Sequence, residues 1–321
     1  MFILCVKSSH AMGMGHLFRM INLHGALRQN GMDATIVLMG EHLPSSEWLE
    51  KAGVQFEVLT DQALAQSNWE AGPALLHGAT VWVNDRLQTD ADHAARIREL
   101  GLRLVTFDDL GSGAALSDIN VTALSGVRRE TPQGAKVLTG LEYLILPPEI
   151  ARFRRKRTEC KSLVVSLGGS DTYGVTVKVA QWLNVRQQHA TLILGPGFSH
   201  EKALAKVPEG SFTVKRSVPS LAAEFASHDL AITGGGLTAF EAAAAGLPTV
   251  TVANEAWEVA HCLHLQALGC SVFAGSHENI DLSALEGHLD IAGMSEAALN
   301  AVDMDGANRV CRELMTLADR S

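Results

Sequence analysis

Three glycine-rich segments of this 321-residue chain each follow an apolar run and precede a stretch of helical period. Glycines let a ligand approach the backbone, and the free amides at the start of a helix attract anionic groups. The first segment runs from Gly13 to Arg19 and includes Gly15 and His16. Because an imidazole accepts a proton near neutral pH, His16 in the first helical turn is a candidate base, with a solvent-facing histidine on a tight turn as the alternative.

The second segment, Gly168-Gly169-Ser170, suits a cradle of backbone amides around a phosphate. It is not a Walker A loop, because no Gly-Lys-Ser or Gly-Lys-Thr follows. The segment at Gly13 also lacks the full Gly-x-Gly-x-x-Gly spacing of dinucleotide-binding proteins, and this argues against an NAD site. We therefore expect an anionic ligand but no nicotinamide cofactor.

The third segment has the most detailed pattern. Its three consecutive glycines, Gly234, Gly235 and Gly236, expose backbone amides to a diphosphate. Thr238 is placed to cap the following helix or to donate to a phosphate. Glu241 lies one turn further on, where a carboxylate accepts hydrogen bonds from ribose hydroxyls, with a capping glutamate as the alternative.

A polar pair, Asn254 and Glu255, follows a later apolar run and is expected at the same edge of a sheet. Residues 90–92 and 303–305 both read Asp-x-Asp, a pattern typical of metal-dependent transferases. Each precedes a helical stretch, however, where acidic residues cap the helix and complement its dipole. We therefore expect no metal site.

Short apolar runs alternate with stretches of helical period along the whole chain. In the first half the predicted strands are 2–6, 34–39, 80–83, 103–107 and 119–123, and the predicted helices are 17–30, 46–52 and 90–100. In the second half the predicted strands are 162–167, 190–194, 229–233 and 249–252, and the predicted helices lie near 174–184, 219–226 and 237–245. This alternation predicts an α/β fold with parallel sheets, in which ligands bind beyond the carboxyl ends of the strands.

The alternation also indicates two similar domains, residues 1–147 and residues 162–302. Between them, residues 148–161 contain a basic run at 152–157 with almost no aliphatic periodicity, so we expect a solvated linker. Residues 303–321 contain an amphipathic stretch that we expect to form a helix packing back on the first domain.

The composition limits the partners. Lys and Arg number 26 against 35 Asp and Glu, and the net charge of −9 is unsuited to broad contact with nucleic acid or an anionic membrane. No run reaches about 18 consecutive apolar residues, so we expect no membrane insertion. The five cysteines are scattered without a Cys-x-x-Cys pair, which argues against a disulfide framework or zinc site and favours the cytoplasm.

Taken in order, the motifs resemble those of a known family. They are Gly13-x-Gly15-His16-x-x-Arg19; Val83-Asn84-Asp85; Phe107-Asp108-Asp109-Leu110-Gly111; Leu167-Gly168-Gly169-Ser170-Asp171; Gly195-Pro196-Gly197; Gly234-Gly235-Gly236 with Glu241; and Gly246-Leu247-Pro248. From about residue 3 to residue 275 the chain resembles the nucleotide-sugar hydrolases of pseudaminic acid biosynthesis and, within that family, predicted glycosyltransferases of spore-coat polysaccharide synthesis. The family is similar to the glycosyltransferase that adds N-acetylglucosamine to the peptidoglycan lipid precursor.

This resemblance implies a GT-B fold, with two doubly wound Rossmann-like domains facing a central cleft. It implies that His16 is the catalytic base, that a UDP-linked sugar is the substrate, and that Asn254 borders the sugar. The implied nucleotide-binding residues are Gly168, Gly169, Ser170, Gly234, Gly235, Gly236, Thr238 and Glu241, the last on the ribose. The implied substrate-binding residues are Gly13, Gly15, Arg19, Asn254 and Glu255.

Two positions depart from the family. Residues 8–10 read Ser-Ser-His where the hydrolases usually have an Asp, and Asn254-Glu255 stands in place of Asn-Gln. We expect inverting, metal-independent hydrolysis of a UDP-linked amino sugar, in nonulosonic acid or surface polysaccharide biosynthesis and without a cofactor. A glycosyltransferase with a carbohydrate or protein acceptor is the alternative, because only the incoming hydroxyl differs, and a non-catalytic nucleotide-sugar-binding protein is the third.

Overall fold

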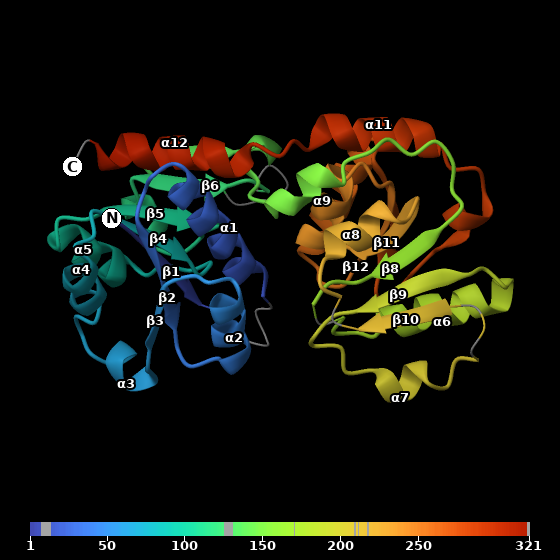
Figure 1. Cartoon of the computed structure of the whole chain (residues 1–321), viewed down its shortest axis with the longest axis horizontal. Helices are drawn as coiled ribbons and strands as arrows, with labels where there is room; N and C mark the ends of the chain where they lie inside the picture. Colours follow the sequence, from blue (N-terminus) through green and yellow to red (C-terminus); the bar gives the residue numbers. More distant parts are fainter. Residues whose placement is uncertain are drawn as a thin grey trace. The chain divides into compact units, whose positions relative to one another are not determined.

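The computed structural model describes residues 1–7, 14–124, 131–169, 171–208, 210, 212–216 and 218–319. The chain divides into two compact units, unit 1 with Met1–Pro147 and Asp305–Ser321, and unit 2 with Pro148–Met304 (Figure 1). Two residues predicted to contact a ligand, Gly13 and Ser170, lie outside the described residues, as does the departure at 8–10.

Unit 1 is built on a parallel sheet of seven strands in the order β3-β2-β1-β4-β5-β6-β7. The strands are β1 Phe2–Lys7, β2 Ala34–Met39, β3 Phe56–Leu59, β4 Val81–Asp85, β5 Arg103–Phe107, β6 Ile119–Thr122 and β7 Lys136–Thr139. The helices are α1 Gly15–Gln29, α2 Leu43–Lys51, α3 Asp61–Leu64, α4 Ala71–His77, α5 Ala91–Glu99 and α12 Gly306–Ala318, with short 3₁₀ turns η1 Ala114–Leu116 and η3 Leu141–Tyr143.

Helices cover both faces of this sheet. The side chains of Phe2, Leu4 and Val6 point to the face covered by α1 and α12, and those of Ile3 and Cys5 point to the opposite face, where α4 and α5 pack. The apolar stripe of α12 is buried in the first of these cores, beside α1 (Figure 1). Burial on both faces explains why the central strands read as continuous apolar runs.

Unit 2 repeats this arrangement with six parallel strands in the order β10-β9-β8-β11-β12-β13. The strands are β8 Leu163–Ser166, β9 Ala190–Leu194, β10 Phe212–Arg216, β11 Leu230–Gly234, β12 Thr249–Ala253 and β13 Ser271–Ser276. The helices are α6 Val175–Arg186, α7 Glu201–Leu204, α8 Leu221–Ala226, α9 Leu237–Ala244, α10 Glu258–Ala267 and α11 Ile291–Ala301, with 3₁₀ turns η4 Pro148–Arg152 and η5 Ser283–Glu286. The predicted α/β class with parallel sheets is confirmed.

Four strands that the apolar pattern did not predict, β3, β7, β10 and β13, form the edges of the two sheets. Their side chains are only partly buried, and four of the five residues of β10 are exposed. An edge strand has a neighbour on one side only, so its sequence does not need the continuous apolar run of a central strand.

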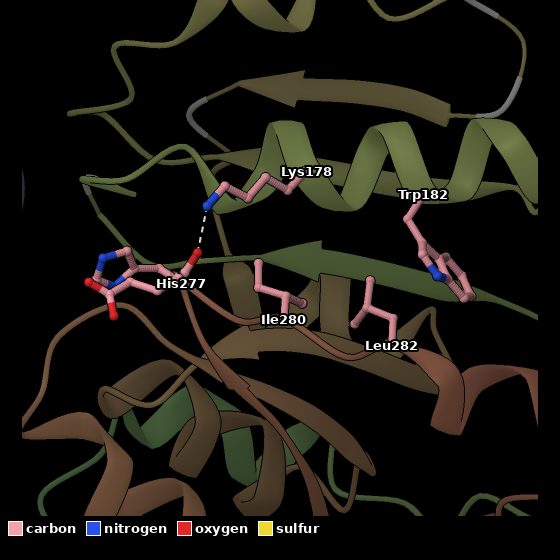
Figure 2. Close-up of a pocket in the computed structure, with 6 residues that line it drawn as sticks. Lys178, Trp182, His277, Ile280 and Leu282 are labelled. Carbon is pink, nitrogen blue, oxygen red and sulfur yellow. Dashed lines mark hydrogen bonds between the residues drawn. The ribbon is translucent and has the colours of Figure 1, made fainter.

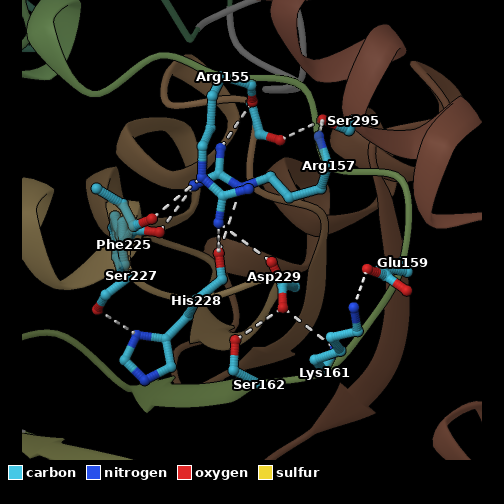
Figure 3. A network of polar contacts seen from close by, with 12 residues as sticks. Arg155, Arg157, Glu159, Lys161, Ser162, Phe225, Ser227, His228, Asp229 and Ser295 are labelled. Carbon is cyan, nitrogen blue, oxygen red and sulfur yellow. Dashed lines mark hydrogen bonds and ion pairs between the residues drawn. The ribbon is translucent and has the colours of Figure 1, made fainter.

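The basic run at 152–157 is not solvated throughout, in contrast to the prediction. Arg157 is 1% exposed, and its guanidinium donates to the backbone carbonyls of Phe225, His228 and Ala245 (Figure 3). These carbonyls lie at or just beyond the carboxyl ends of α8 and α9, where unpaired carbonyl groups and the helix dipole attract a cation. Burial lowers the pKa of Arg157 to about 10. The run therefore joins two helix ends of unit 2.

We expect Arg157→Met to lower the free energy of unfolding by about 2–4 kcal/mol, because several buried carbonyls lose their donor. The neighbouring Lys156→Met is the matched control, since Lys156 is exposed and pairs with an exposed Glu296. Its effect should stay below about 1 kcal/mol. Urea unfolding followed by tryptophan fluorescence measures both. Equal midpoints for the two variants would contradict the structural role of Arg157.

Candidate functional site

Each sheet has one point where the direction of strand order reverses. In unit 1, β1 lies between β2 and β4, and in unit 2, β8 lies between β9 and β11. The helices that follow the two strands at such a point leave on opposite faces, so ligands of open α/β sheets bind there, beyond the carboxyl ends of the strands. Most of the predicted site residues follow β1, β8 or β11, and Asn254 and Glu255 follow the neighbouring β12.

We call the place where the strand order reverses the switch point of the sheet. At the switch point of unit 1, His16 lies next to a buried carboxylate. His16 is the second residue of α1, after Gly15, and its Nδ1 lies 2.7 Å from Oδ1 of Asp85, the last residue of β4. Although burial opposes ionisation, the charges and hydrogen bonds of Arg19 and His16 lower the pKa of Asp85 to about 2. A carboxylate only accepts hydrogen bonds, so Nδ1 of His16 carries a proton in this pairing, and Nε2 is the nitrogen that has the lone pair whenever the ring is neutral. The His16 side chain is 15% exposed.

Arg19 holds the two acidic residues at this point. Its Nε and Nη2 donate to the two carboxylate oxygens of Asp85 at 2.8 and 2.6 Å, and its Nη1 donates to Asp108, which follows β5. The guanidinium is 8% exposed and also lies over the ring of Phe107. Because its donors face protein carboxylates, this geometry favours a positioning role for Arg19 over the substrate contact that we expected.

Hydrogen bonds join the loop after β4 to the loop after β5, close to Asp85 and Asp108. The buried carboxylate of Asp109 accepts hydrogen bonds from the backbone amides of Thr89 at 3.0 Å and Gly111 at 2.8 Å, and from the Thr89 hydroxyl. A Cβ atom at Gly111 would lie 2.2 Å from the carbonyl oxygen of Thr89, so only glycine fits there. The adjoining Asp108 has a φ of 49°, which is unusual for a residue with a side chain.

In unit 2, a carboxylate of the protein takes up the amides at the start of the helix that follows the Gly168-Gly169 segment. The Asp171 carboxylate caps α6 by accepting hydrogen bonds from the amides of Val175 at 2.8 Å and Thr176 at 2.9 Å. Gly168 and Gly169 precede this cap, and Gly195 packs so closely that a Cβ atom there would lie 2.3 Å from the Gly168 carbonyl oxygen. The amides at the start of α6 are thus already satisfied.

The Glu258 carboxylate, at the start of α10, occupies the second set of amides. It accepts hydrogen bonds from the amides of Asn254 at 2.7 Å and Gly235 at 3.3 Å. His261 donates from Nδ1 to the Gly235 carbonyl at 3.1 Å. The sequence predicted that three consecutive glycine amides face a ligand, and the amide of Gly235 departs from that prediction because it faces Glu258. Sequence reasoning assigned no role to Glu258.

The start of α9 remains without such a cap. Gly236 is its N-cap residue, and no side chain of the described residues caps this helix. The hydroxyl of Thr238 lies in its first turn, 3.8 Å from where a Cβ atom at Gly168 would be. The first-turn amides of a helix have no partner within the helix. The start of α9 is therefore the place at the switch point of unit 2 that attracts an anion.

Glu241 lies one turn further along α9. Burial, together with the charge of Glu149, raises the pKa of Glu241 to about 7. Within the described part of the chain its carboxyl group has no hydrogen-bond or ion-pair partner, and it is partly exposed. A pair of ligand hydroxyl groups would supply the missing donors.

The two residues predicted after β12 differ in burial. Asn254 is 6% exposed, its Nδ2 donates to the Leu167 carbonyl at 3.4 Å, and its buried Oδ1 has no partner among the described residues. Glu255 is more exposed, so it is the more accessible of the pair.

An open pocket of about 290 Å³ also lies in unit 2, but outside this switch point. It is lined by Lys178 and Trp182 of α6 and by His277, Glu278, Ile280 and Leu282 after β13 (Figure 2). Lys178 donates to the carbonyl oxygen of His277. None of the predicted site residues lines this pocket.

Two searches of the described residues gave negative findings. No group of three or more His, Cys, Asp or Glu side chains in them is arranged to hold a metal ion. Among their helices, none combines the length and apolar character needed to cross a membrane.

Comparison with known proteins finds distant relatives, and no family model matches the chain. An uncharacterized protein of Methanocaldococcus jannaschii is 28% identical over 261 residues, which cover 75% of this chain and 53% of that protein. The chain thus spans about half of that relative's length. The spore coat polysaccharide biosynthesis protein SpsG of Bacillus subtilis is 23% identical over 256 residues, covering 75% of this chain and 74% of SpsG.

Solved structures match the whole chain. MurG of Acinetobacter baumannii has a TM-score of 0.71 at 13% identity, covering 98% of this chain and 99% of MurG. HepE of Anabaena, in complex with UDP, has a TM-score of 0.66 at 15% identity, and the match covers 98% of this chain and 100% of HepE. The spinosyn rhamnosyltransferase SpnG has a TM-score of 0.65 at 16% identity and covers both chains fully at 100%. The predicted GT-B fold class, with two Rossmann-like parallel-sheet domains, is confirmed.

We expect Asp85→Asn to change the tautomer of His16, because an asparagine amide does not select a proton on Nδ1. Nitrogen NMR of histidine-labelled protein above neutral pH should show Nδ1-protonated His16 in the parent chain and a mixture in the variant. Loss of one of the two carboxylate partners of buried Arg19 should also lower the free energy of unfolding by about 2–4 kcal/mol. The exposed Asp33→Asn is the control and should change neither; an unchanged tautomer in Asp85→Asn would contradict the pairing.

We also expect Glu241 to make stability depend on pH. Between its ordinary pKa of 4.5 and its folded pKa of about 7, the folded carboxyl binds more protons than the unfolded one, so stability falls as pH rises through this window. Glu241→Gln removes the titration. Relative to the parent chain it should gain about 1–3 kcal/mol between pH 4 and pH 8, as measured by urea unfolding. The exposed Glu278→Gln should show no such gain, and a pH-independent difference for Glu241→Gln would refute the assignment.

Proposed function

We propose that this chain is a glycosyltransferase that takes a sugar from a uridine diphosphate donor and transfers it to a hydroxyl group in polysaccharide biosynthesis. The observation that supports this most directly is the pairing of His16 Nδ1 with the buried carboxylate of Asp85, which leaves Nε2 as the ring nitrogen available to accept a proton at the switch point of unit 1. The names of SpsG and of the transferases among the solved structures, and the UDP bound to HepE, support the substrate class.

In this proposal His16 is the general base. Nε2 accepts the proton of the acceptor hydroxyl as its oxygen bonds to the anomeric carbon, and the bond from that carbon to the UDP oxygen breaks on the opposite face. The configuration is therefore inverted. Asp85 stabilises the imidazolium that forms, and Arg19 keeps Asp85 ionised and in place.

Unit 2 binds the nucleotide in this proposal. The start of α9, with Gly236 and Thr238, stabilises the diphosphate of the leaving UDP, and Glu241 accepts hydrogen bonds from the ribose hydroxyls. Gly168 lies near Thr238, and Gly234 lies near the Leu167 carbonyl, so both segments border this point. Asn254 and Glu255 lie beyond β12 on the sugar side.

Water is the other possible nucleophile, and it gives the hydrolase that the sequence motifs resemble. The same base and nucleotide site serve both reactions, so they differ only in what attacks the anomeric carbon. SpsG and SpnG favour the transferase.

UDP should bind in the presence of a metal chelator, as measured by calorimetry, because helix amides and not a cation receive the diphosphate. Glu241→Ala should weaken binding by about 1–3 kcal/mol through the loss of charge-assisted hydrogen bonds. The exposed Glu286→Ala is the matched control. Equal UDP affinity in Glu241→Ala and the parent chain would remove Glu241 from the nucleotide site.

Turnover should require both His16 and an acceptor. With a panel of UDP-sugars, release of UDP should rise at least tenfold when carbohydrate acceptors are added. His16→Ala should lower turnover by about 10²–10⁴-fold while UDP affinity is kept. His77→Ala, a histidine of α4 paired with Glu57, is the control. UDP release that is equally fast without any acceptor would replace the transferase with the hydrolase, and UDP binding without turnover would favour the non-catalytic protein.

A further inference from the structure

The last two residues of β4 place their side chains on opposite faces of the sheet. Asp85 pairs with Arg19 and His16 on the face covered by α1. Side chains alternate along a strand, so Asn84 lies on the other face, where its amide oxygen accepts a hydrogen bond from the Trp82 indole at 2.8 Å. Because an indole only donates, this bond fixes the orientation of the Asn84 amide and directs its Nδ2 away from Trp82.

The hydroxyl of Thr89, in the loop after β4, joins Asn84 to the loop after β5. It accepts a hydrogen bond from Nδ2 of Asn84 at 3.1 Å and donates to the carboxylate of Asp109. A hydroxyl has one hydrogen and a carboxylate only accepts, so these two roles cannot be exchanged. All three side chains are fully buried, and water therefore does not compete for these hydrogen bonds.

Asp109 fixes the backbone next to Asp108. Its carboxylate also accepts hydrogen bonds from the amides of Thr89 and Gly111, and its carbonyl oxygen accepts one from Nδ2 of Asn120 at 3.1 Å. The φ of 49° at Asp108 is sparsely populated by residues with a side chain, and such a conformation persists where the surrounding structure enforces it. The contacts of Asp109 provide that enforcement on the residue that follows Asp108.

These contacts form a closed network around the ends of β4 and β5. It leads from Asp108 through the Arg19 guanidinium to Asp85, and from the neighbouring Asn84 through the Thr89 hydroxyl back to Asp109. We call this set the β4–β5 network: Arg19, Asn84, Asp85, Thr89, Asp108 and Asp109. In a closed network of buried hydrogen bonds, a change at one member is passed to its neighbours from two sides.

We propose that Thr89 and Asp109 are positioning residues for His16. They hold Asp108 where its carboxylate receives Arg19, and Arg19 in turn holds Asp85 where it accepts the hydrogen bond from Nδ1 of His16. Precise placement matters for a base, because a displacement of about 1 Å costs about 10²-fold in rate. That His16 is the base rests on the proposed function, whereas the positioning is a property of the folded chain alone.

Thr89→Val and Thr89→Ser test the proposal as a matched pair, since valine has the shape of threonine without the hydroxyl and serine keeps the hydroxyl. Nitrogen NMR of the full chain, labelled at arginine and histidine, observes Nε–H of Arg19, which donates to Asp85, and the ring of His16. In Thr89→Val, exchange of the Arg19 Nε hydrogen with water should become faster by about tenfold or more. Above neutral pH, the His16 ring should change from Nδ1-protonated to a mixture of tautomers. Thr89→Ser should keep both signals of the parent chain.

Ser112→Ala is the control for the loss of a hydrogen bond near the same loops. The Ser112 hydroxyl accepts a hydrogen bond from the amide of Ala91 at 3.0 Å, on the exposed side of the loop after β5. Its loss should change neither signal. In an Asp108→Asn background, Thr89→Val should have no further effect, because Thr89 acts through Asp108. If Thr89→Val does not fold, Asp109→Asn serves in its place and should shift both signals in the same direction, because a donor then faces the Thr89 hydroxyl.

Three outcomes would overturn the proposal. They are unchanged Arg19 and His16 signals in Thr89→Val or its substitute, an equal change in Ser112→Ala, and a full further effect of Thr89→Val in the Asp108→Asn background. Because the signals are measured without any substrate, each of these outcomes leaves the proposed function standing. Absence of turnover in the parent chain would instead overturn the proposed function and leave the positioning of His16 untouched.

Discussion

The ion pair between Arg19 and Asp85 is the interaction on which the rest of unit 1's site depends. Asp85 is fully buried, and a buried carboxylate is stable only with a paired cation and with hydrogen bonds on its oxygens. Arg19 supplies two donors to it and a third to Asp108, so a single guanidinium joins α1 to the ends of β4 and β5. The orientation of His16 follows from this, because an ionised Asp85 accepts a hydrogen bond from Nδ1–H of the ring.

In unit 2 the buried carboxylates pair with backbone amides instead of with an arginine. Several helix starts and glycine amides converge at its switch point, and each attracts negative charge. Asp171 and Glu258 satisfy two of them from within the protein, which leaves the start of α9 for an external anion. Glu258 also contacts the glycine turn itself, through the amide of Gly235. Glu241, in contrast, has no hydrogen-bond or ion-pair partner among the described residues, and burial together with the charge of Glu149 raises its pKa.

The similarity to solved structures at 13–16% identity shows how little of the sequence this fold requires. What the fold does require is the apolar character of the central strands and the glycines where loops pack closely, as at Gly111 against Thr89. The residues at the carboxyl ends of the strands make the polar contacts of unit 1's site, such as the pairing of His16 with Asp85 that orients the imidazole ring.

The sequence by itself determined the α/β class, the central strands and the glycine segments, because these depend on local apolar runs and on residues with unusual backbone freedom. It did not show the edge strands. These strands are partly exposed, so their sequences lack the continuous apolar run that identifies a central strand. Nor did it show that Asp85 pairs with His16, 69 positions away, or that Glu258 occupies the amide of Gly235. The sequence also predicted that Arg157 is solvated, because it lies in a basic run, whereas the structure buries it. The two pairings depend on strand order, since the adjacency of β1 with β4 brings His16 to Asp85 and the adjacency of β11 with β12 brings Gly235 to Glu258.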